Sequence, residues 1–359
     1  MERLTESNAD NRATLPQYLV AATLYLPRGN ALSSVLLNIA DSTKKIAALV
    51  AKGALADISN KLDVINIQGE EQTNIDVLSN DIFIAGLKQS GLVVGVVSEE
   101  LEAPYLIAKS SGGEEFFVVF DPLDGSSNVS VNVSTGSIFS VLPALKDKSQ
   151  SCNFLQSGDT QLAAGYALYG PSTMFVLTIG NGVQGFTLDA ETQEFILTHP
   201  NIKIPATTSE FAINASNERY WELPVRNYVK GCQDGATGIR ERDFNMRWVA
   251  SMVADVHRIL MRGGVYLYPT DYKLPIKLGR LRLLYEANPI SFIVEQAGGK
   301  SSTGRMRILE IEPDEIHQRV PVIMGSHLEV SLIEWYHSEF DSALVQDRTS
   351  YTLDNAQLS

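Results

Sequence analysis

Carboxylates close apolar runs at four places in this sequence. They are Asp76, the pair Glu99-Glu100, Asp121 with Asp124, and Glu286. One acid at the end of a strand is common and is usually only solvated. The segment that makes the pattern informative is residues 120–128, which read Phe-Asp-Pro-Leu-Asp-Gly-Ser-Ser-Asn.

The local chemistry of this nonapeptide favours a metal and phosphate site. Pro122 fixes one φ angle and Gly125 permits a tight or left-handed turn, so the chain can point Asp121 and Asp124 at one centre. The small residues that follow leave backbone N–H groups free to approach a phosphate. Mg²⁺ prefers oxygen ligands and bridges to substrate oxygens. An isolated Asp-x-x-Asp-Gly would instead favour a surface turn without a ligand.

The elements that must position these acids are mixed in the N-terminal half. Apolar residues at helical spacing predict a helix over 31–52, and a second helix follows around 77–83. Short β-rich runs lie at 92–97, 116–120, 137–141, 174–178 and 185–188. Because helices do not alternate with these runs, they predict a meander.

The character changes from about residue 206. Val249, Val253, Val256 and Leu260 recur at helical spacing before Gly263-Gly264, and a strand over 265–268 and a helix ending near Gln296 follow. We expect an N-terminal α+β half over 1–205, a C-terminal α/β half over 206–345, and a polar, frayed tail over 346–359.

Composition and charge restrict the class of protein. The 359 residues are 44% hydrophobic and 20% charged, as in ordinary soluble proteins. A net charge of −13 argues against nucleic acid or an anionic membrane as partner. With no signal peptide or membrane span in the sequence, we expect a cytoplasmic location. Cys152 and Cys232 are then expected to be reduced thiols.

Residues 121–128 resemble the metal-and-phosphate signature of the lithium-sensitive phosphatase superfamily, in its class I fructose-1,6-bisphosphatase form. Leu123 and the double serine differ from the pattern of inositol monophosphatases. Further similar segments occur in order from about residue 35 to 340: 75–80, 97–100, 134–139, 163–170, 247–258, 281–289 and 317–326. The resemblance implies an α/β (α+β) fold, a layered αβαβα sandwich of two halves with the active site between them.

The resemblance also implies the reaction and its metal. A sugar bisphosphate, fructose 1,6-bisphosphate, would lose its 1-phosphate by metal-assisted in-line attack of water. Two or more Mg²⁺ ions per site, for which Mn²⁺ could substitute, would be held by Glu99, Asp121, the Leu123 carbonyl, Asp124 and Glu286. Glu100 is the candidate base, Asp76 would lie near the metals, and Glu70 matches an acid on a mobile loop.

Two sets of residues would bind the substrate's phosphates and sugar. Arg282 and the backbone of Gly125 and Ser126, followed by Ser127, would hold the 1-phosphate. The far phosphate and the sugar would contact Asn214, Arg247, Trp248, Met252, Tyr268 and Arg280. Arg247 would come from a neighbouring subunit, which implies a homo-oligomer, usually a tetramer.

Three departures from the family pattern affect this second set. Arg280 replaces a lysine, Trp248 replaces a tyrosine, and residues 215–217 lack a tyrosine often found there. The regulatory region also differs, because Glu115 stands where relatives carry a basic residue that binds AMP, and a negative charge repels phosphate. We therefore expect AMP inhibition to be weak or absent.

Other functions are compatible with parts of this pattern. A sedoheptulose-1,7-bisphosphatase, or an enzyme acting on both sugars, would use the same metal and phosphate groups. A non-catalytic sugar-phosphate sensor is disfavoured, because every matched metal carboxylate is present. A monophosphatase is disfavoured as well, since it has no need of the second phosphate set.

Overall fold

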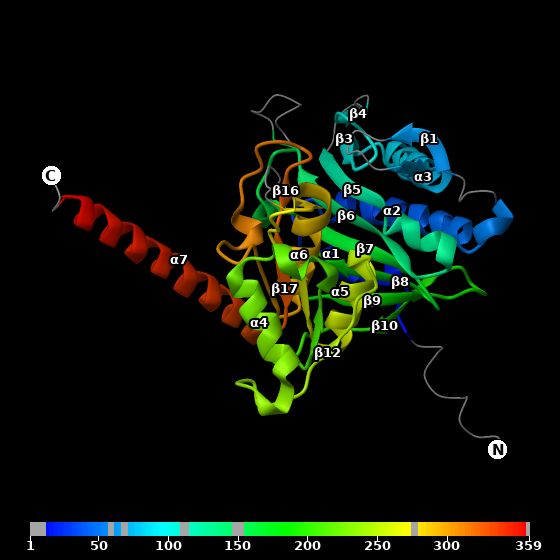
Figure 1. Cartoon of the computed structure of the whole chain (residues 1–359). Coiled ribbons are helices and arrows are strands. Elements are labelled where there is room, and N and C mark those ends of the chain that lie inside the picture. Colours follow the sequence, from blue (N-terminus) through cyan, green and yellow to red (C-terminus); the bar gives the residue numbers. More distant parts are fainter. Residues whose placement is uncertain are drawn as a thin grey trace, which may run out of the picture.

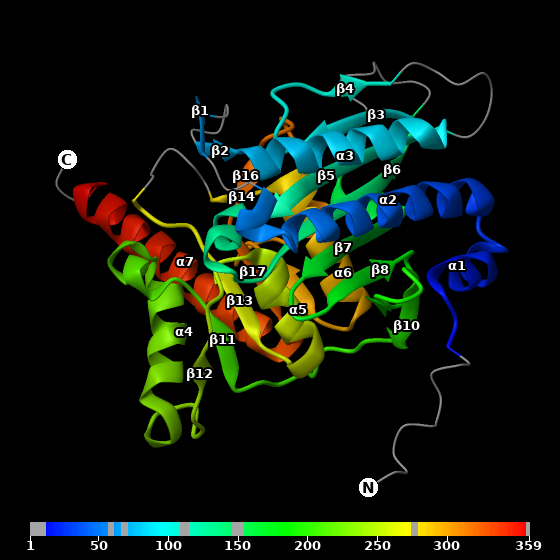
Figure 2. The same ribbon diagram turned by 90° about the vertical axis from the view of Figure 1, so that its right-hand side faces the viewer.

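The structure is a computed structural model that describes residues 12–56, 61–65, 71–107, 115–145, 154–273 and 279–356. Its helices and strands stack in five alternating layers (Figures 1 and 2). This arrangement confirms the layered αβαβα sandwich that the family resemblance implies. Glu70 and Cys152 lie outside the described residues.

Within the described part of the chain, the larger sheet has eight strands in the order β10-β9-β8-β7-β6-β5-β3-β4. They are β3 (Val93–Ser98), β4 (Tyr105–Leu106), β5 (Phe116–Asp124), β6 (Thr135–Pro143), β7 (Ala163–Tyr169), β8 (Thr173–Thr178), β9 (Gln184–Leu188) and β10 (Phe195–His199). Pairing is antiparallel along the sheet except between β3 and β5, which are parallel. The predicted meander is thus confirmed for the strands from β5 to β9. The sequence missed β7, which lies between β6 and β8, and β10, and its first predicted run, β3, pairs in parallel with β5.

Three helices cover the outer face of this sheet. They are α1 (Leu15–Thr23), α2 (Gly29–Val50) and α3 (Asn74–Ser90). The apolar stripe of α2, including Val35, Leu36 and Ile39, is buried against the sheet together with Phe83 and Phe120. Figure 2 shows α2 and α3 lying side by side across the strands. A short hairpin of β1 (Lys61–Ile65) and β2 (Glu71–Thr73) precedes α3.

The smaller sheet has, among the described residues, five strands in the order β12-β11-β13-β17-β15. They are β11 (Glu210–Ala212), β12 (Asn245–Met246), β13 (Val265–Tyr268), β15 (Lys300–Ser302) and β17 (Val322–Gly325). Between the two sheets lie α5 (Met252–Arg262) and α6 (Asn288–Gln296). One apolar cluster joins all three layers, with Ile138 and Tyr166 from the first sheet, Val256 and Ile290 from the helices, and Met324 from the second sheet.

The outermost layer is formed by α4 (Leu223–Asp234) and α7 (His327–Ala356), which pack on the second sheet. α7 continues to Ala356, into the segment from residue 346 that the sequence predicts to be a polar, frayed tail. The segment contains no glycine or proline after residue 325, so nothing local stops the helix. Figure 1 shows its C-terminal part projecting away from the layers.

The remaining elements are short. They are β14 (Leu281–Arg282) paired with β16 (Arg319–Val320), the 3₁₀ helices η1 (Gly53–Ala56), η2 (Ser126–Val131), η4 (Gly158–Thr160), η5 (Ala215–Tyr220), η6 (Gly235–Thr237) and η8 (Ile308–Glu310), and the π-helix η7 (Leu283–Ala287). None of the described helices has the length and apolarity needed to cross a bilayer.

Candidate active site

The parallel pair β3 and β5 brings two of the acidic segments together. Ser98, the last residue of β3, lies opposite Phe120 of β5. Because parallel strands end at the same edge of a sheet, Glu99 and Glu100 emerge beside Asp121 and Asp124. The backbone N–H of Glu99 donates to the carbonyl of Phe120 over 3.2 Å and fixes this relation.

The turn that carries Asp121 and Asp124 is built by an irregularity in β5. The pairing with β6 shifts register between these two residues, where Pro122 has no N–H to donate. Asp121 Oδ1 accepts from the Leu123 N–H at 2.9 Å, which closes the turn. Gly125 follows with φ of 72°, and a Cβ at this position would lie 2.7 Å from Cβ of Ser251. Only glycine fits there.

The N-terminus of α5 binds the second aspartate. Oδ2 of Asp124 accepts from the hydroxyl of Ser251 at 2.6 Å and from the N–H of Val253 at 2.9 Å. Ser251 is the N-cap of α5, so the carboxylate also lies at the positive end of the helix dipole. The two halves of the chain thereby meet at Asp124.

Glu286 reaches the same place from the π-helix η7. Insertion of an extra residue per turn re-aims side chains, and such segments are frequent at functional sites. The N–H of Arg282 donates to Oε2 of Glu286, and Nη1 of Arg282 lies 3.1 Å from Oε1 of Glu99. Arg282 is buried, and its guanidinium offsets part of the negative charge.

Burial of so many acids shifts their proton affinity. Burial raises the pKa of Asp121 well above its usual range, and the charges of Glu99, Asp124 and Glu286 raise it further. Burial also raises the pKa of Glu286 to about 8, against the lowering effect of Arg282. One carboxylate oxygen each from Asp121, Asp124 and Glu286 lies within 4.8 Å of the others. Buried, closely spaced hard oxygens fit a divalent cation, which would reverse these shifts.

A cavity of about 410 Å³ opens over this cluster. Its volume is in the range of small-molecule sites. Fifteen of the residues expected from the sequence line it: Asp76, Glu99, Glu100, Asp121, Leu123, Asp124, Gly125, Ser126, Ser127, Asn214, Trp248, Met252, Tyr268, Arg282 and Glu286. The structure thus brings together side chains from both halves.

Asp76 serves the fold as well as lining the cavity. It is the third residue of α3, and its Oδ2 accepts from the N–H of Thr73 at 2.9 Å and from the Thr73 hydroxyl at 2.7 Å. This contact starts the helix. Met252 likewise contributes to both the fold and the cavity, since it is buried in the apolar cluster between the sheets and also lines the cavity.

Three further lining residues were missed in the sequence: Ala250, Tyr266 and Leu281. Tyr266 stacks on Trp248 with ring centroids 5.8 Å apart and planes 8° from parallel. It lies two residues before Tyr268 on β13, and strand alternation places both on one face, a signal that could have found it. Ala250 has a φ of 66°, a backbone conformation that residues other than glycine rarely adopt. The local sequence does not reveal it.

Two predicted residues do not line the cavity of this chain. Arg247 is half exposed, and its Nε donates to Glu210 Oε1 at 3.0 Å. Arg280 pairs with Asp271 at 3.0 Å. Each cation pairs with a carboxylate and is next in sequence to a lining residue, Arg247 to Trp248 and Arg280 to Leu281. Arg247 also follows the edge strand β12 directly.

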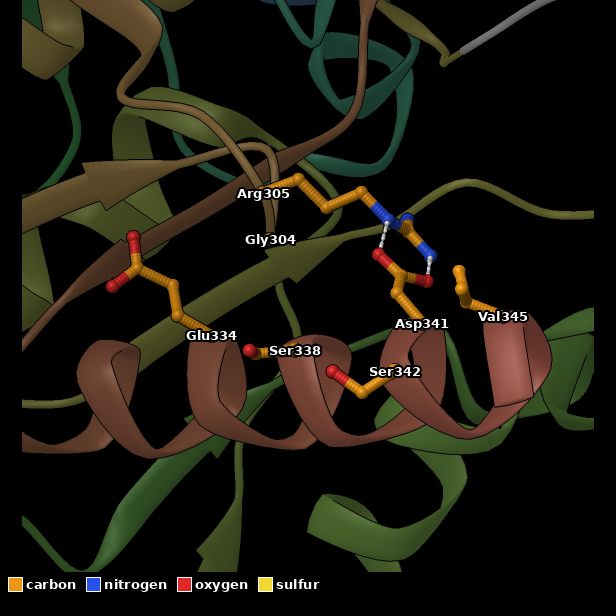
Figure 3. A pocket seen from close by; sticks show the side chains of 7 residues that line it. All are labelled: Gly304, Arg305, Glu334, Ser338, Asp341, Ser342 and Val345. Atoms are coloured by element: carbon orange, nitrogen blue, oxygen red, sulfur yellow. Dashed lines mark hydrogen bonds and ion pairs between the residues drawn. The ribbon is translucent and has the colours of Figure 1, made fainter. Parts of the chain in front are cut away.

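A second hollow, of about 770 Å³, lies between α7 and the turn at Gly304-Arg305 (Figure 3). Arg305 donates to both oxygens of Asp341, at 2.7 and 2.9 Å, and to both oxygens of Glu222, at 3.1 and 3.2 Å. Because two carboxylates already neutralise the positive charge of this guanidinium, the hollow has little positive charge with which to bind a phosphate. It shares no residue with the acidic cavity.

Most of the chain is similar to proteins of one family. Residues 13–200 match the family model described as the fructose-1-6-bisphosphatase N-terminal domain, and residues 204–338 match that of the C-terminal domain. Two curated relatives are fructose-1,6-bisphosphatases of class 1. The one from Hydrogenophilus thermoluteolus is 53% identical over 92% of this chain and 94% of its own length, and the one from Acinetobacter baumannii is 56% identical over 85% and 94%.

A solved structure agrees with the sequence relatives. Leishmania major fructose-1,6-bisphosphatase in its holo form superposes with a TM-score of 0.84 at 37% identity, covering 91% of this chain and 99% of its own. The T-state structure of the same protein gives a TM-score of 0.81, also at 37% identity and 91% coverage of this chain. Together with the acidic cavity, these matches show that the chain belongs to the fructose-1,6-bisphosphatase family.

Proposed function

We propose that the chain hydrolyses the 1-phosphate of fructose 1,6-bisphosphate to give fructose 6-phosphate and phosphate, with Mg²⁺ as its cofactor. The observation that carries this proposal is the convergence of Asp121, Asp124 and Glu286 within one buried cluster at the floor of a cavity. Family membership supports the reaction, and the oxygen-rich donor set supports a hard divalent cation, with Mn²⁺ as a substitute.

The metal ligands are proposed to be the residues that surround this cluster. They are Glu99, Asp121, the carbonyl of Leu123, Asp124 and Glu286, for two or more ions. When bound, the cations supply positive charge that offsets the charge developing on the phosphoryl and leaving oxygens. The protein's part is to hold the ligands fixed, and the bonds to Asp124 from α5 and to Glu286 from Arg282 do so.

Residues at the rim are proposed to act on water and on the phosphate. Glu100 is the base that orients and deprotonates the attacking water, and Asp76 and Glu70 assist it. The N–H groups of Gly125 and Ser126 and the guanidinium of Arg282 bind the 1-phosphate, with Ser127 beside them. A planar guanidinium suits phosphate oxygens, and the burial of Arg282 strengthens that attraction.

The far side of the cavity is proposed to bind the sugar and the second phosphate. Trp248, Tyr266 and Tyr268 form an aromatic wall, in which Trp248 lies 5.8 Å from the ring centroid of each tyrosine. Asn214 and Met252 also line this side, and Arg280, which pairs with Asp271 outside the lining, is proposed to bind the second phosphate. We propose that Arg247 acts in the cavity of a neighbouring subunit of a homotetramer, a role supported by its exposed position after an edge strand.

Two further expectations stay as proposals. The division into halves near residue 205 is supported by the bounds of the two family models and by the separate sheets. The cytoplasmic location remains a prediction from the sequence.

Phosphate release from fructose 1,6-bisphosphate tests the function. The assay compares sedoheptulose 1,7-bisphosphate, fructose 6-phosphate and inositol 1-phosphate, each with Mg²⁺ and with a chelator. We expect Mg²⁺-dependent loss of one phosphate from the fructose bisphosphate and little attack on the monophosphates. A higher kcat/KM for sedoheptulose 1,7-bisphosphate would make the seven-carbon sugar the preferred substrate. No turnover of either bisphosphate would contradict the proposed phosphatase function.

A further inference from the structure

His317 lies between the π-helix that carries Glu286 and the turn that carries Glu99 and Glu100. It stands two residues before β16, which pairs with β14. Just beyond this pair, the N–H of Leu283 donates to the carbonyl of Gln318 at 2.7 Å. The chain around His317 is therefore bonded to the strand that leads directly into the π-helix of Glu286.

One nitrogen of the His317 ring binds the residue next to Glu286. The hydroxyl of Tyr285 lies 2.8 Å from Nδ1, and the two rings meet edge to face with centroids 5.9 Å apart. Tyr285 is fully buried in a small apolar cluster with Val97, Phe117 and Leu284. The ring of Tyr285 therefore packs among apolar side chains while its hydroxyl forms a hydrogen bond with His317, and this bond fixes the orientation of the tyrosine.

The other nitrogen faces the turn of Glu99 and Glu100. Nε2 of His317 lies 3.4 Å from the backbone carbonyl of Glu102. A neutral imidazole with its proton on Nε2 donates to this carbonyl and accepts from Tyr285 at the same time. One ring therefore spans from the π-helix to the turn after β3.

We propose that His317 is a positioning residue that fixes the distance between Glu99 and Glu286, and so sets the affinity of the acidic cluster for divalent cations. The inference rests on the proposed role of this cluster in cation binding. Nothing in it requires His317 to touch the substrate. Groups that orient metal ligands in this way typically affect affinity about 10- to 100-fold.

Other bonds also hold the turn that follows β3. Its backbone is bonded near its start, from Glu99 to Phe120 and, over 3.3 Å, from the N–H of Leu101 to Ser98. Both bonds lead back into the first sheet. The Glu99 side chain already meets Arg282 of the C-terminal half at 3.1 Å, and His317 adds a second link to that half, from the backbone carbonyl of Glu102 to Tyr285 beside Glu286.

Mn²⁺ binding to the full-length protein, measured by electron paramagnetic resonance without substrate, tests the proposal. We expect His317→Ala to weaken binding about tenfold. His317→Asn keeps an acceptor near the Nδ1 position and His317→Gln keeps a donor near the Nε2 position, so each should recover part of the loss. Tyr285→Phe should weaken binding to a similar degree, and the double variant should be no weaker than the worse single one.

Tyr166 and His257 provide a matched control. Their hydroxyl-to-Nδ1 distance is also 2.8 Å and their rings are 88° apart, but they join β7 to α5. His257→Ala should cost stability and leave Mn²⁺ affinity within about twofold. Unchanged affinity in a folded His317→Ala protein, or in Tyr285→Phe if the alanine variant does not fold, would overturn the proposal. Because the readout needs no turnover, failure of fructose 1,6-bisphosphate hydrolysis in the wild type would contradict only the proposed reaction.

Discussion

The hydroxyl of Ser251 donates a hydrogen bond of 2.6 Å to Oδ2 of Asp124, 127 positions earlier in the chain. Asp124 is the last residue of β5, whereas Ser251 is the N-cap of α5. This bond, with the one from the Val253 N–H, makes the geometry of the acidic turn depend on the C-terminal half.

Ser251→Ala should therefore lower kcat/KM by about tenfold or more, because a hydrogen bond to a charged group contributes roughly 1.5–3 kcal/mol. Ser251→Thr retains the hydroxyl and should retain most of the activity. Thr14→Ala is the control, since Thr14 caps α1 and borders neither cavity. If both alanine variants lose stability but neither loses activity, the role of Ser251 is limited to capping.

Removing a charge from the acidic cluster should separate stability from activity. Asp121→Asn should abolish turnover, reducing kcat at least about 100-fold, and should raise Tm in a chelator, because the buried carboxylate with its raised pKa is costly without a cation. The Tm gain on adding Mg²⁺ should shrink. Differential scanning calorimetry and phosphate release check both effects.

Glu334→Gln removes the same charge in the hollow beside α7, where Glu334 pairs with Lys300. It should change neither activity nor the response to Mg²⁺. A lower Tm for Asp121→Asn in chelator would contradict the electrostatic argument.

Proton release should accompany metal binding. Glu286 has a pKa of about 8 in the folded chain and 4.5 as the reference value, so between these pH values the folded state holds a proton that the unfolded chain has lost. The free energy of unfolding of the metal-free protein should thus fall as pH rises through this window. A cation replaces the proton, so the Tm gain with Mg²⁺ should grow toward pH 8. Glu286→Gln should flatten the dependence, and a slope unchanged in that variant would rule out this residue as its source.

Arg247 should act on substrate affinity across subunits. Arg247→Ala should raise KM for fructose 1,6-bisphosphate about tenfold or more and change kcat little, since it removes one phosphate contact. Refolding the Arg247→Ala protein together with the Asp121→Asn protein should restore activity with a low KM. In such a mixed oligomer the Asp121→Asn chain provides Arg247, and the Arg247→Ala chain provides the intact acidic cluster. Arg262→Ala also breaks a pair with Glu210 and serves as the control. Absence of any restoration in mixed oligomers would place Arg247 outside the neighbouring site.

AMP should inhibit weakly or not at all, because Glu115 places a negative charge at the position where the family resemblance implies a basic residue for the nucleotide's phosphate. Initial rates at increasing AMP check this expectation. A submillimolar inhibition constant would contradict it, and Glu115→Lys should then be compared with the wild type.

The acids at strand ends could be predicted from sequence because their signal is local. An apolar run ending at Ser98 or Phe120 shows where a buried strand stops, and the parallel pairing of β3 and β5 then brings the following carboxylates together. Ser251 and Ala250 gave no such signal. The importance of Ser251 depends on a partner 127 positions away, and the positive φ of Ala250 depends on the surrounding tertiary structure. The pairing of Arg280 with Asp271 likewise depends on the tertiary structure and could not be predicted from the local sequence.

The apolar cluster between the two sheets has a consequence for how this enzyme can move. Side chains from the first sheet, from α5 and α6, and from the second sheet interlock in one continuous interior. A clamshell opening of the halves would tear that interior and expose it to water, at a cost far above thermal energy. Substrate should therefore reach the cavity, and product should leave it, without separation of the two halves. Because Met252 and Tyr266 belong to this interior and also line the cavity, a change of sugar specificity at either position would have to preserve the packing between the sheets.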